Sequence, residues 1–236
     1  MRNIHYNYLS AILIVTLASG YSIGQVSLDS ICSFDTLETG MITRICYHEN
    51  GAIGSILHYK DGYAEGEYLN YDSLGRLTSR SYYVHEQEIG ESITNDYEHG
   101  IFCASEHNVD GSSHSICRYE NGQKMEESYS VNGIIKGLYL RWHQNGRLSL
   151  RMHQDEGVSR YCVFFDNGKI STKGKIFNSP FAKIGRWVTK DVRGNRIRVE
   201  HFSKKEPNVK HGTFKYYVDG KLIRVEKYVS DVLINK

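Results

Sequence analysis

Four residues in one short stretch carry side chains that zinc binds. Cys103, His107, His114 and Cys117 lie within fifteen positions, and thiolate and imidazole groups are common zinc ligands. Their spacing is not that of a zinc finger, and the sequence NVDGSS between the two histidines is typical of a plain loop. Two cysteines of an exported chain tend to oxidise to a disulfide. We therefore expect a disulfide-closed hairpin and no metal at this stretch, with a zinc site as the alternative.

Histidines near turns and carboxylates are the second arrangement that could do chemistry. His143 precedes a turn in the sequence WHQNG, and His153 is followed closely by Asp155 and Glu156. General acid–base catalysis needs such groups in a shaped pocket beside an oriented partner, whereas turn-flanking histidines are more often solvated. No Gly-x-Ser-x-Gly, phosphate-loop or paired-carboxylate motif is present. We expect a non-enzyme without a cofactor; the alternative is a hydrolase that uses His143 or His153.

The cysteines form two equally spaced pairs. Cys32 and Cys46 are fourteen positions apart, as are Cys103 and Cys117, and a glycine stands beside the midpoint of each pair. A hairpin that turns at this glycine sets the two cysteines opposite each other, at a Cα separation of about 4.5–5.5 Å that a disulfide can bridge. We expect both disulfides, on condition that the chain is exported. Cys162 has no partner at this spacing and is expected to be a buried free thiol.

Export is indicated by the first 24 residues of the sequence. Arg2 is followed by the mostly apolar run Leu9–Ala18 and then by small residues, including Gly20 and Gly24. A run of about ten such residues is too short to span a bilayer but is typical of a secretory signal. We expect residues 1–24 to be a signal peptide and residues 25–236 to be one repeat domain without a transmembrane segment, located in the periplasm, on the outer surface or in the medium. The alternative is a buried N-terminal strand or helix.

The composition favours β-structure and excludes two classes of partner. The sequence has 18 Tyr, 8 Phe and 22 Gly but only 2 Pro. Aromatic residues cover pleated surfaces, and glycine supplies the positive φ that many turns require. The formal net charge is +2 over 236 residues, so we expect neither nucleic acid nor an anionic membrane surface as a partner.

Glycines recur along the chain at the expected hairpin turns. Asn50, Asn121, Asn145 and Asn167 each directly precede such a glycine, and Asp219 precedes the last one. Asn-Gly and Asp-Gly between alternating hydrophobic residues predict type I′ turns, in which both central residues have positive φ. The turn glycines follow one another at intervals of 22–26 residues and are Gly51, Gly75, Gly100, Gly122, Gly146, Gly168, Gly194 and Gly220.

A second glycine opens each repeat unit, and two positions for aromatic rings follow it. Gly66, Gly137 and Gly185 stand nine residues before their turn glycine, and Gly212 stands eight before. The template is Gly-x-aromatic-x-x-aromatic-x-x-x-Gly-x-apolar, and Lys190 replaces one second ring. Aromatic side chains supply large contact area at low entropic cost. The candidate interaction surface is formed by Tyr68, Tyr71, Tyr139, Trp142, Trp187, Phe214 and Tyr217; the alternative is that these rings are core.

The turns predict the fold class, which is all-β. Eight hairpin turns require about fifteen short strands in a continuous, twisted antiparallel meander, and neighbouring hairpins must stack because one hairpin cannot bury its apolar face. The sequence LYLRWH places Leu138, Leu140 and Trp142 on one face and Tyr139 and Arg141 on the other. Such alternation predicts one packed face and one solvated face. The apolar leucine side is the one expected to pack.

These units resemble the variant form of the MORN repeat, a tandem β-hairpin motif in which a glycine and an aromatic residue open each unit. The resemblance covers roughly Cys46–Tyr228 and is clearest over residues 119–228. It implies an extended antiparallel sheet without catalytic residues of its own. Some bacterial members of this family are catalogued as antitoxin components.

The function that we expect is that of an exported, non-enzymatic scaffold for protein or glycan contacts at the cell envelope. The alternative is an antitoxin or immunity-type protein that neutralises a toxin, against which the export signal argues. The basic and aromatic stretch RGNRIRVEHFSKK, residues 193–205, could bind an anion or a polysaccharide, but its nearby acids favour an ordinary outer face of a sheet. The sequence identifies neither the ligand nor the oligomeric state.

Overall fold

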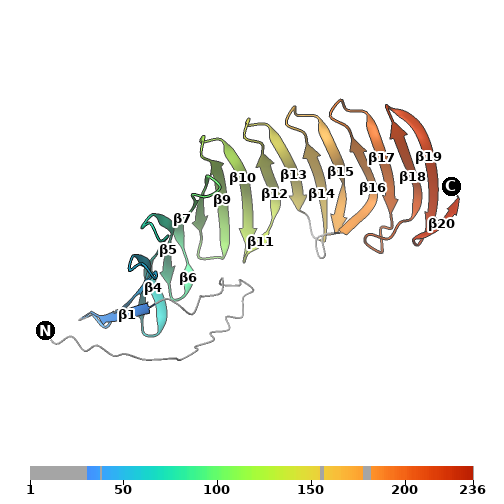
Figure 1. Cartoon of the computed structure of the whole chain (residues 1–236). Helices are drawn as coiled ribbons and strands as arrows, with labels where there is room; N and C mark the ends of the chain where they lie inside the picture. Colours follow the sequence, from blue (N-terminus) through green and yellow to red (C-terminus); the bar gives the residue numbers. More distant parts are fainter. Residues whose placement is uncertain (1–30, 38, 155–156, 178–181, 236) are drawn as a thin grey trace.

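The computed structural model of the chain is a single β-sheet without helices in the described residues (Figure 1). It describes residues 31–37, 39–154, 157–177 and 182–235, so the expected signal peptide lies outside it. The strands follow one another in one curved row with β1 and β20 at opposite ends, and no second layer of strands covers either face of this part of the chain (Figure 1). Within the same residues, no helix is long and apolar enough to cross a bilayer.

The described residues form twenty strands. The first ten are β1 (Ile31–Thr36), β2 (Ile42–Tyr47), β3 (Ile53–Lys60), β4 (Tyr63–Tyr71), β5 (Leu77–Val84), β6 (Gln87–Glu88), β7 (Gly90–Asp96), β8 (Ile101–His107), β9 (Ser112–Tyr119) and β10 (Lys124–Val131). The others are β11 (Ile134–Ile135), β12 (Gly137–Trp142), β13 (Leu148–Gln154), β14 (Val158–Phe164), β15 (Ile170–Phe177), β16 (Ala182–Lys190), β17 (Arg196–Phe202), β18 (Gly212–Val218), β19 (Lys221–Val229) and β20 (Val232–Asn235).

The strand pairing is that of an antiparallel meander, which confirms the expected fold class. Consecutive strands pair with each other, except that the two-residue strands β6 and β11 share β5 and β10 with β7 and β12. The sheet is open, because β1 pairs only with β2 and β20 pairs only with β19. The twenty strands exceed the expected fifteen in part because two expected strands are split into β6–β7 and β11–β12.

The turn glycines of the repeat all have positive φ, from 62° to 98°, but none of the four Asn-Gly turns predicted at these glycines is of type I′, because none of their asparagines has positive φ. At one of them the Gly146 N–H donates to the His143 carbonyl (2.9 Å), and the His143 N–H donates to the Arg147 carbonyl (2.8 Å). Asn145 has no positive φ, so this is a three-residue loop in which only the glycine is left-handed. Asp219–Gly220 does form the two-residue turn, with φ of 46° and 75°.

Asparagines before the turn glycines connect one turn to the next along this edge of the sheet. The Asn145 Oδ1 accepts the Arg147 N–H (3.0 Å), and its Nδ2 donates to the carbonyl of Asp166 in the next turn of the same edge (2.9 Å). The same two bonds are made by Asn50, Asn121 and Asn167. Each asparagine therefore uses both an acceptor and a donor, which aspartate cannot supply at neutral pH.

Regular bulges follow these turns and curve the sheet. Arg141 lies opposite Leu150 but Trp142 lies opposite Leu148, which leaves Ser149 without a direct partner. The same shift occurs in β3, β5, β15, β17 and β19. An extra residue on one strand bends it and increases the local twist, which accounts for the curved row in Figure 1.

Burial is concentrated on one face and in the second half of the chain. Alternate residues of a strand share a face, as do directly paired residues of neighbouring strands. The pairing therefore places one set of residues together on what we call the aromatic face: Tyr68, Tyr139, Met152, Tyr161, Trp187 and Phe214. Met152, Ile176 and Trp187 form its buried cluster.

The expectation that the leucine side of β12 is packed is wrong. Leu138 is 41% exposed, whereas Tyr139, its neighbour on the aromatic face, packs against the buried cluster. In a single-layer sheet no second layer covers an aliphatic side chain. Side chains in this sheet are covered only by neighbours on the same face: long rings lean over adjacent strands on the aromatic face, and Ile184, Val188 and Val199 are buried among side chains of the other face.

Candidate interaction surfaces

The first ring of each repeat unit lies on the aromatic face. These rings are Tyr68, Tyr139, Trp187 and Phe214. Trp187 is 3% exposed and Phe214 is 1% exposed, and the Trp187 Nε1–H donates to the Lys175 carbonyl (3.0 Å). Trp187 and Phe214 are therefore core residues, as in the alternative interpretation of the rings, and they leave no ring surface for a partner.

The second ring of each unit lies on the opposite face. Tyr71, Trp142 and Tyr217 come three residues after the first ring, and an odd step along a strand reverses the face. All three are half-buried, and the ammonium of Lys124 lies 5.6 Å from the centre of the Trp142 ring. The seven residues of the candidate interaction surface therefore do not form one surface. They are divided between the two faces of the sheet, and only Trp187 and Phe214 are fully buried.

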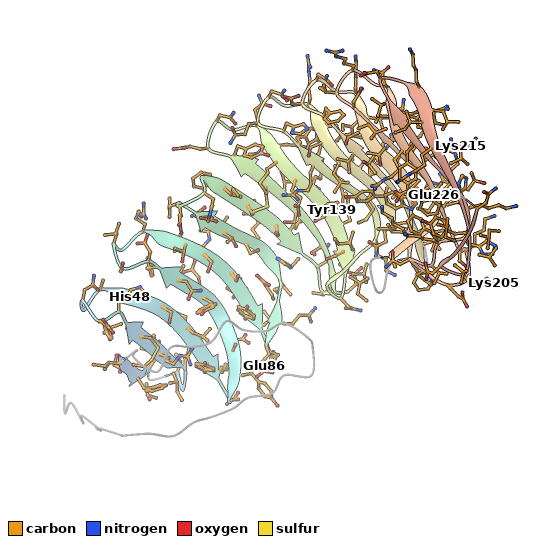
Figure 2. All side chains as sticks on the ribbon, turned by 45° about the vertical axis from the view of Figure 1, so that its right-hand side comes forward. His48, Glu86, Tyr139, Lys205, Lys215 and Glu226 are labelled. Atoms are coloured by element: carbon orange, nitrogen blue, oxygen red, sulfur yellow. A yellow bond between two sulfur atoms is a disulfide. The ribbon has the colours of Figure 1, made fainter. Side chains whose placement is uncertain are left out.

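Carboxylates hold several rings of the aromatic face (Tyr139 and Glu226 are labelled in Figure 2). Glu226 is 8% exposed, and its Oε2 accepts hydrogen bonds from the hydroxyls of Tyr216 and Tyr228, both 2.9 Å long. These bonds lower the pKa of Glu226 below its ordinary value. The Tyr139 hydroxyl donates to Glu126 Oε2 (2.6 Å), and burial together with this bond raises the pKa of Tyr139. Glu126 and Glu226 therefore hold tyrosine rings in place by accepting hydrogen bonds from their hydroxyls.

Both expected disulfides are present. Cys32 is bonded to Cys46 and Cys103 to Cys117, with Cα separations of 4.0 and 3.9 Å, and each pair lies directly opposite across its hairpin. Cys162 is a half-buried free thiol, and burial raises its pKa. The symmetrical spacing about a turn glycine was therefore sufficient to identify both pairs.

The four candidate zinc ligands do not converge. Cys103 and Cys117 are consumed by their disulfide. His107 lies opposite Gly90 on the aromatic face, whereas His114 lies opposite Glu106 on the other face. No group of three or more metal-ligating side chains occurs in the described residues.

The candidate catalytic histidine His143 is part of the turn architecture. Its Nε2–H donates to the carbonyl of Phe164 (3.0 Å), the last residue of β14. His48 occupies the equivalent position in the turn at Gly51. Its Nε2–H donates to the Tyr71 carbonyl in the same way (2.9 Å). His153 is exposed on β13, and Asp155 and Glu156 lie outside the described residues. The repeated geometry gives His143 a positional role.

The sequence analysis missed a row of serines between the two groups of rings on the aromatic face. Ser92, Ser105, Ser115 and Ser128 are directly paired across β7, β8, β9 and β10. The Ser105 hydroxyl donates to that of Ser115 (2.8 Å). The row leaves a stretch of small hydroxyl side chains on this face. Its signal in the sequence is serine at positions that become neighbours only once the strand register is known.

No family model matches the chain, and no curated protein matches it either.

Proposed function

We propose that the chain is an exported, non-enzymatic β-repeat scaffold, similar to variant MORN-repeat proteins, that contacts a protein or glycan partner at the cell envelope. The observation that carries the proposal is the recurrence of half-exposed rings, at Tyr71, Trp142 and Tyr217, on one face of an open single-layer sheet. Partly exposed aromatic side chains are the residues from which binding hot spots are most often built.

Two further features support the proposal. The disulfides Cys32–Cys46 and Cys103–Cys117 are typical of proteins that fold in an oxidising compartment. Tyr71 and Trp142 stand at the ends of β4 and β12, next to turns that take part in the asparagine bonds from one turn to the next, which we call the asparagine ladder. This arrangement presents these two rings on a pre-organised support, which lowers the entropic cost of binding.

The proposal is tested by binding to a glycan array and to detergent-solubilised envelope proteins. The oxidised wild-type chain is compared with Trp142→Ala, and with Tyr139→Phe as a matched control on the same strand but the aromatic face. We expect Trp142→Ala to weaken binding about tenfold or more and Tyr139→Phe to leave it within about twofold. Unchanged binding by a folded Trp142→Ala protein, verified by circular dichroism, would refute the proposal.

A further inference from the structure

A groove crosses β7, β8 and β9 on the face opposite the aromatic face. Its volume is about 480 Å³, within the range of ligand-binding sites. Ile93, Ala104 and Ile116 are direct partners across the three strands and form its floor. Ala104 is the smallest of them and lies on the middle strand, with Phe102 two residues away on the same face. The longer side chains around Ala104 therefore leave a hollow with an apolar floor.

One end of the groove is acidic. Glu91 on β7 and Glu106 on β8 line it and lie directly opposite each other. Both side chains are exposed, and neither carboxylate forms an ion pair or a hydrogen bond with any other described residue. Like charges directly opposite in a sheet destabilise it. A cation placed between these two carboxylates would relieve this repulsion.

The two basic side chains that line the groove are engaged elsewhere. His114 lies directly opposite Glu106, but its Nε2 bonds the Glu127 carboxylate (3.1 Å). Arg118 lines the other end of the groove, where its Nη1 donates to the Gly122 carbonyl (3.1 Å). Arg80 on β5 lies opposite Ile93, but it forms no ion pair with Glu91 or Glu106. The acidic end is therefore open to a cation from outside the chain.

We propose that this groove binds a lysine side chain of a protein partner. The row of Ala104 and the row of Glu106 are one pleat repeat apart, about 6.6–6.8 Å, which a four-carbon stem can span. The stem lies over the apolar floor at Ala104, and the compact ammonium lies between Glu91 and Glu106. None of the second rings of the repeat lines this groove. The proposed lysine site can therefore be tested separately from the proposed function.

The test uses two small probes that differ only in the charged group. Nα-acetyl-lysine methylamide and its neutral isostere Nα-acetyl-norleucine methylamide are titrated into the oxidised, isotope-labelled full chain, and backbone amide shifts are followed by NMR. We expect the lysine probe to shift the amides of Ile93, Ala104 and Ile116, with an apparent Kd at least about threefold lower than that of the norleucine probe.

Variants decide whether the acidic pair is responsible. Glu91→Gln combined with Glu106→Gln should abolish the preference for the lysine probe, and Glu67→Gln, an exposed acid on the same face of β4, should retain it. Equal shifts with both probes, shifts outside the groove only, no shifts at all, or the same loss of preference in Glu67→Gln would each overturn the proposal.

Discussion

The indole of Trp187 packs directly onto the backbone of Gly174 on the neighbouring strand, and a Cβ added at Gly174 would overlap the ring. Gly174 has no positive φ, unlike the turn glycines, so this position requires glycine for space and not for backbone conformation. The close approach lets the ring complete the buried cluster with Met152 and Ile176. One missing side chain thereby allows a large ring to be buried in a sheet that has no second layer.

Gly174→Ala is therefore expected to destabilise the chain by overpacking, by about 1–3 kcal/mol in the free energy of unfolding. Urea unfolding followed by circular dichroism measures this loss. In a Trp187→Leu background the overlap is relieved, so the same substitution should cost clearly less. An equal cost in both backgrounds would mean that the ring is not the cause.

The asparagine ladder predicts a graded effect at Asn145. Asn145→Ala removes both the bond to the Arg147 N–H and the bond to the Asp166 carbonyl, and should lower the free energy of unfolding by about 1–2 kcal/mol. Asn145→Asp keeps the acceptor and loses only the donor, so it should cost about half as much. Thermal unfolding ranks the three proteins, and a substitution to aspartate as harmful as that to alanine would argue against two separate bonds.

Features that depend on local spacing were predictable from the sequence. The disulfides followed from two cysteine pairs, each centred beside a turn glycine. The meander followed from the regular recurrence of turn glycines from Gly51 to Gly220, because hairpin turns are encoded by a few adjacent residues. The alternation of side chains in a strand also implies that Tyr139 and Trp142 lie on opposite faces. The predicted interaction surface, which combined Tyr139 and Trp142, was therefore inconsistent with the alternation of side chains.

Features that depend on register were not predictable. The extra residue at Ser149 changes which side chains are opposite each other, and no residue type marks it. The groove also depends on the pairing of Ala104 with Ile93, whereas its pairing with Ile116 follows from the predicted opposition of Cys103 and Cys117. The packed face was misassigned because hydrophobic alternation identifies two faces but does not reveal that neither is covered by a second layer.

Acid should weaken the region around Glu226. The pKa of this carboxyl is lowered from 4.5 by the hydroxyls of Tyr216 and Tyr228, so its contribution to stability is fully present above pH 4.5 and is lost as the pH falls through the lower folded value. Other carboxyls with lowered pKa values act in the same direction: Asp72, Asp96, Asp110, Glu127 and Asp191.

The contribution of Glu226 is isolated by comparing variants. Glu226→Gln should be less stable than the wild type at pH 7 and should lose less stability between pH 5 and 3, because glutamine does not titrate. Glu67→Gln, at an exposed position, should show the slope of the wild type. Parallel unfolding curves for the wild type and Glu226→Gln over this pH range would show that the two hydroxyl bonds contribute no pH dependence.

Alkylation with iodoacetamide should distinguish the cysteines by chemistry. The chain has five cysteines, of which four are disulfide-bonded and Cys162 is free. Mass spectrometry of the denatured, unreduced protein should therefore show one added group, and five after reduction. Under native conditions at pH 7 the reaction of Cys162 should be slow, because burial raises the pKa of its thiol and the thiolate is the nucleophile.

Reduction should also destabilise the hairpin closed by Cys103 and Cys117, by about 3 kcal/mol for a loop of this size. Labelling of Cys103 and Cys117 after treatment with a chelator alone, without a reductant, would instead support the zinc alternative and contradict the disulfide.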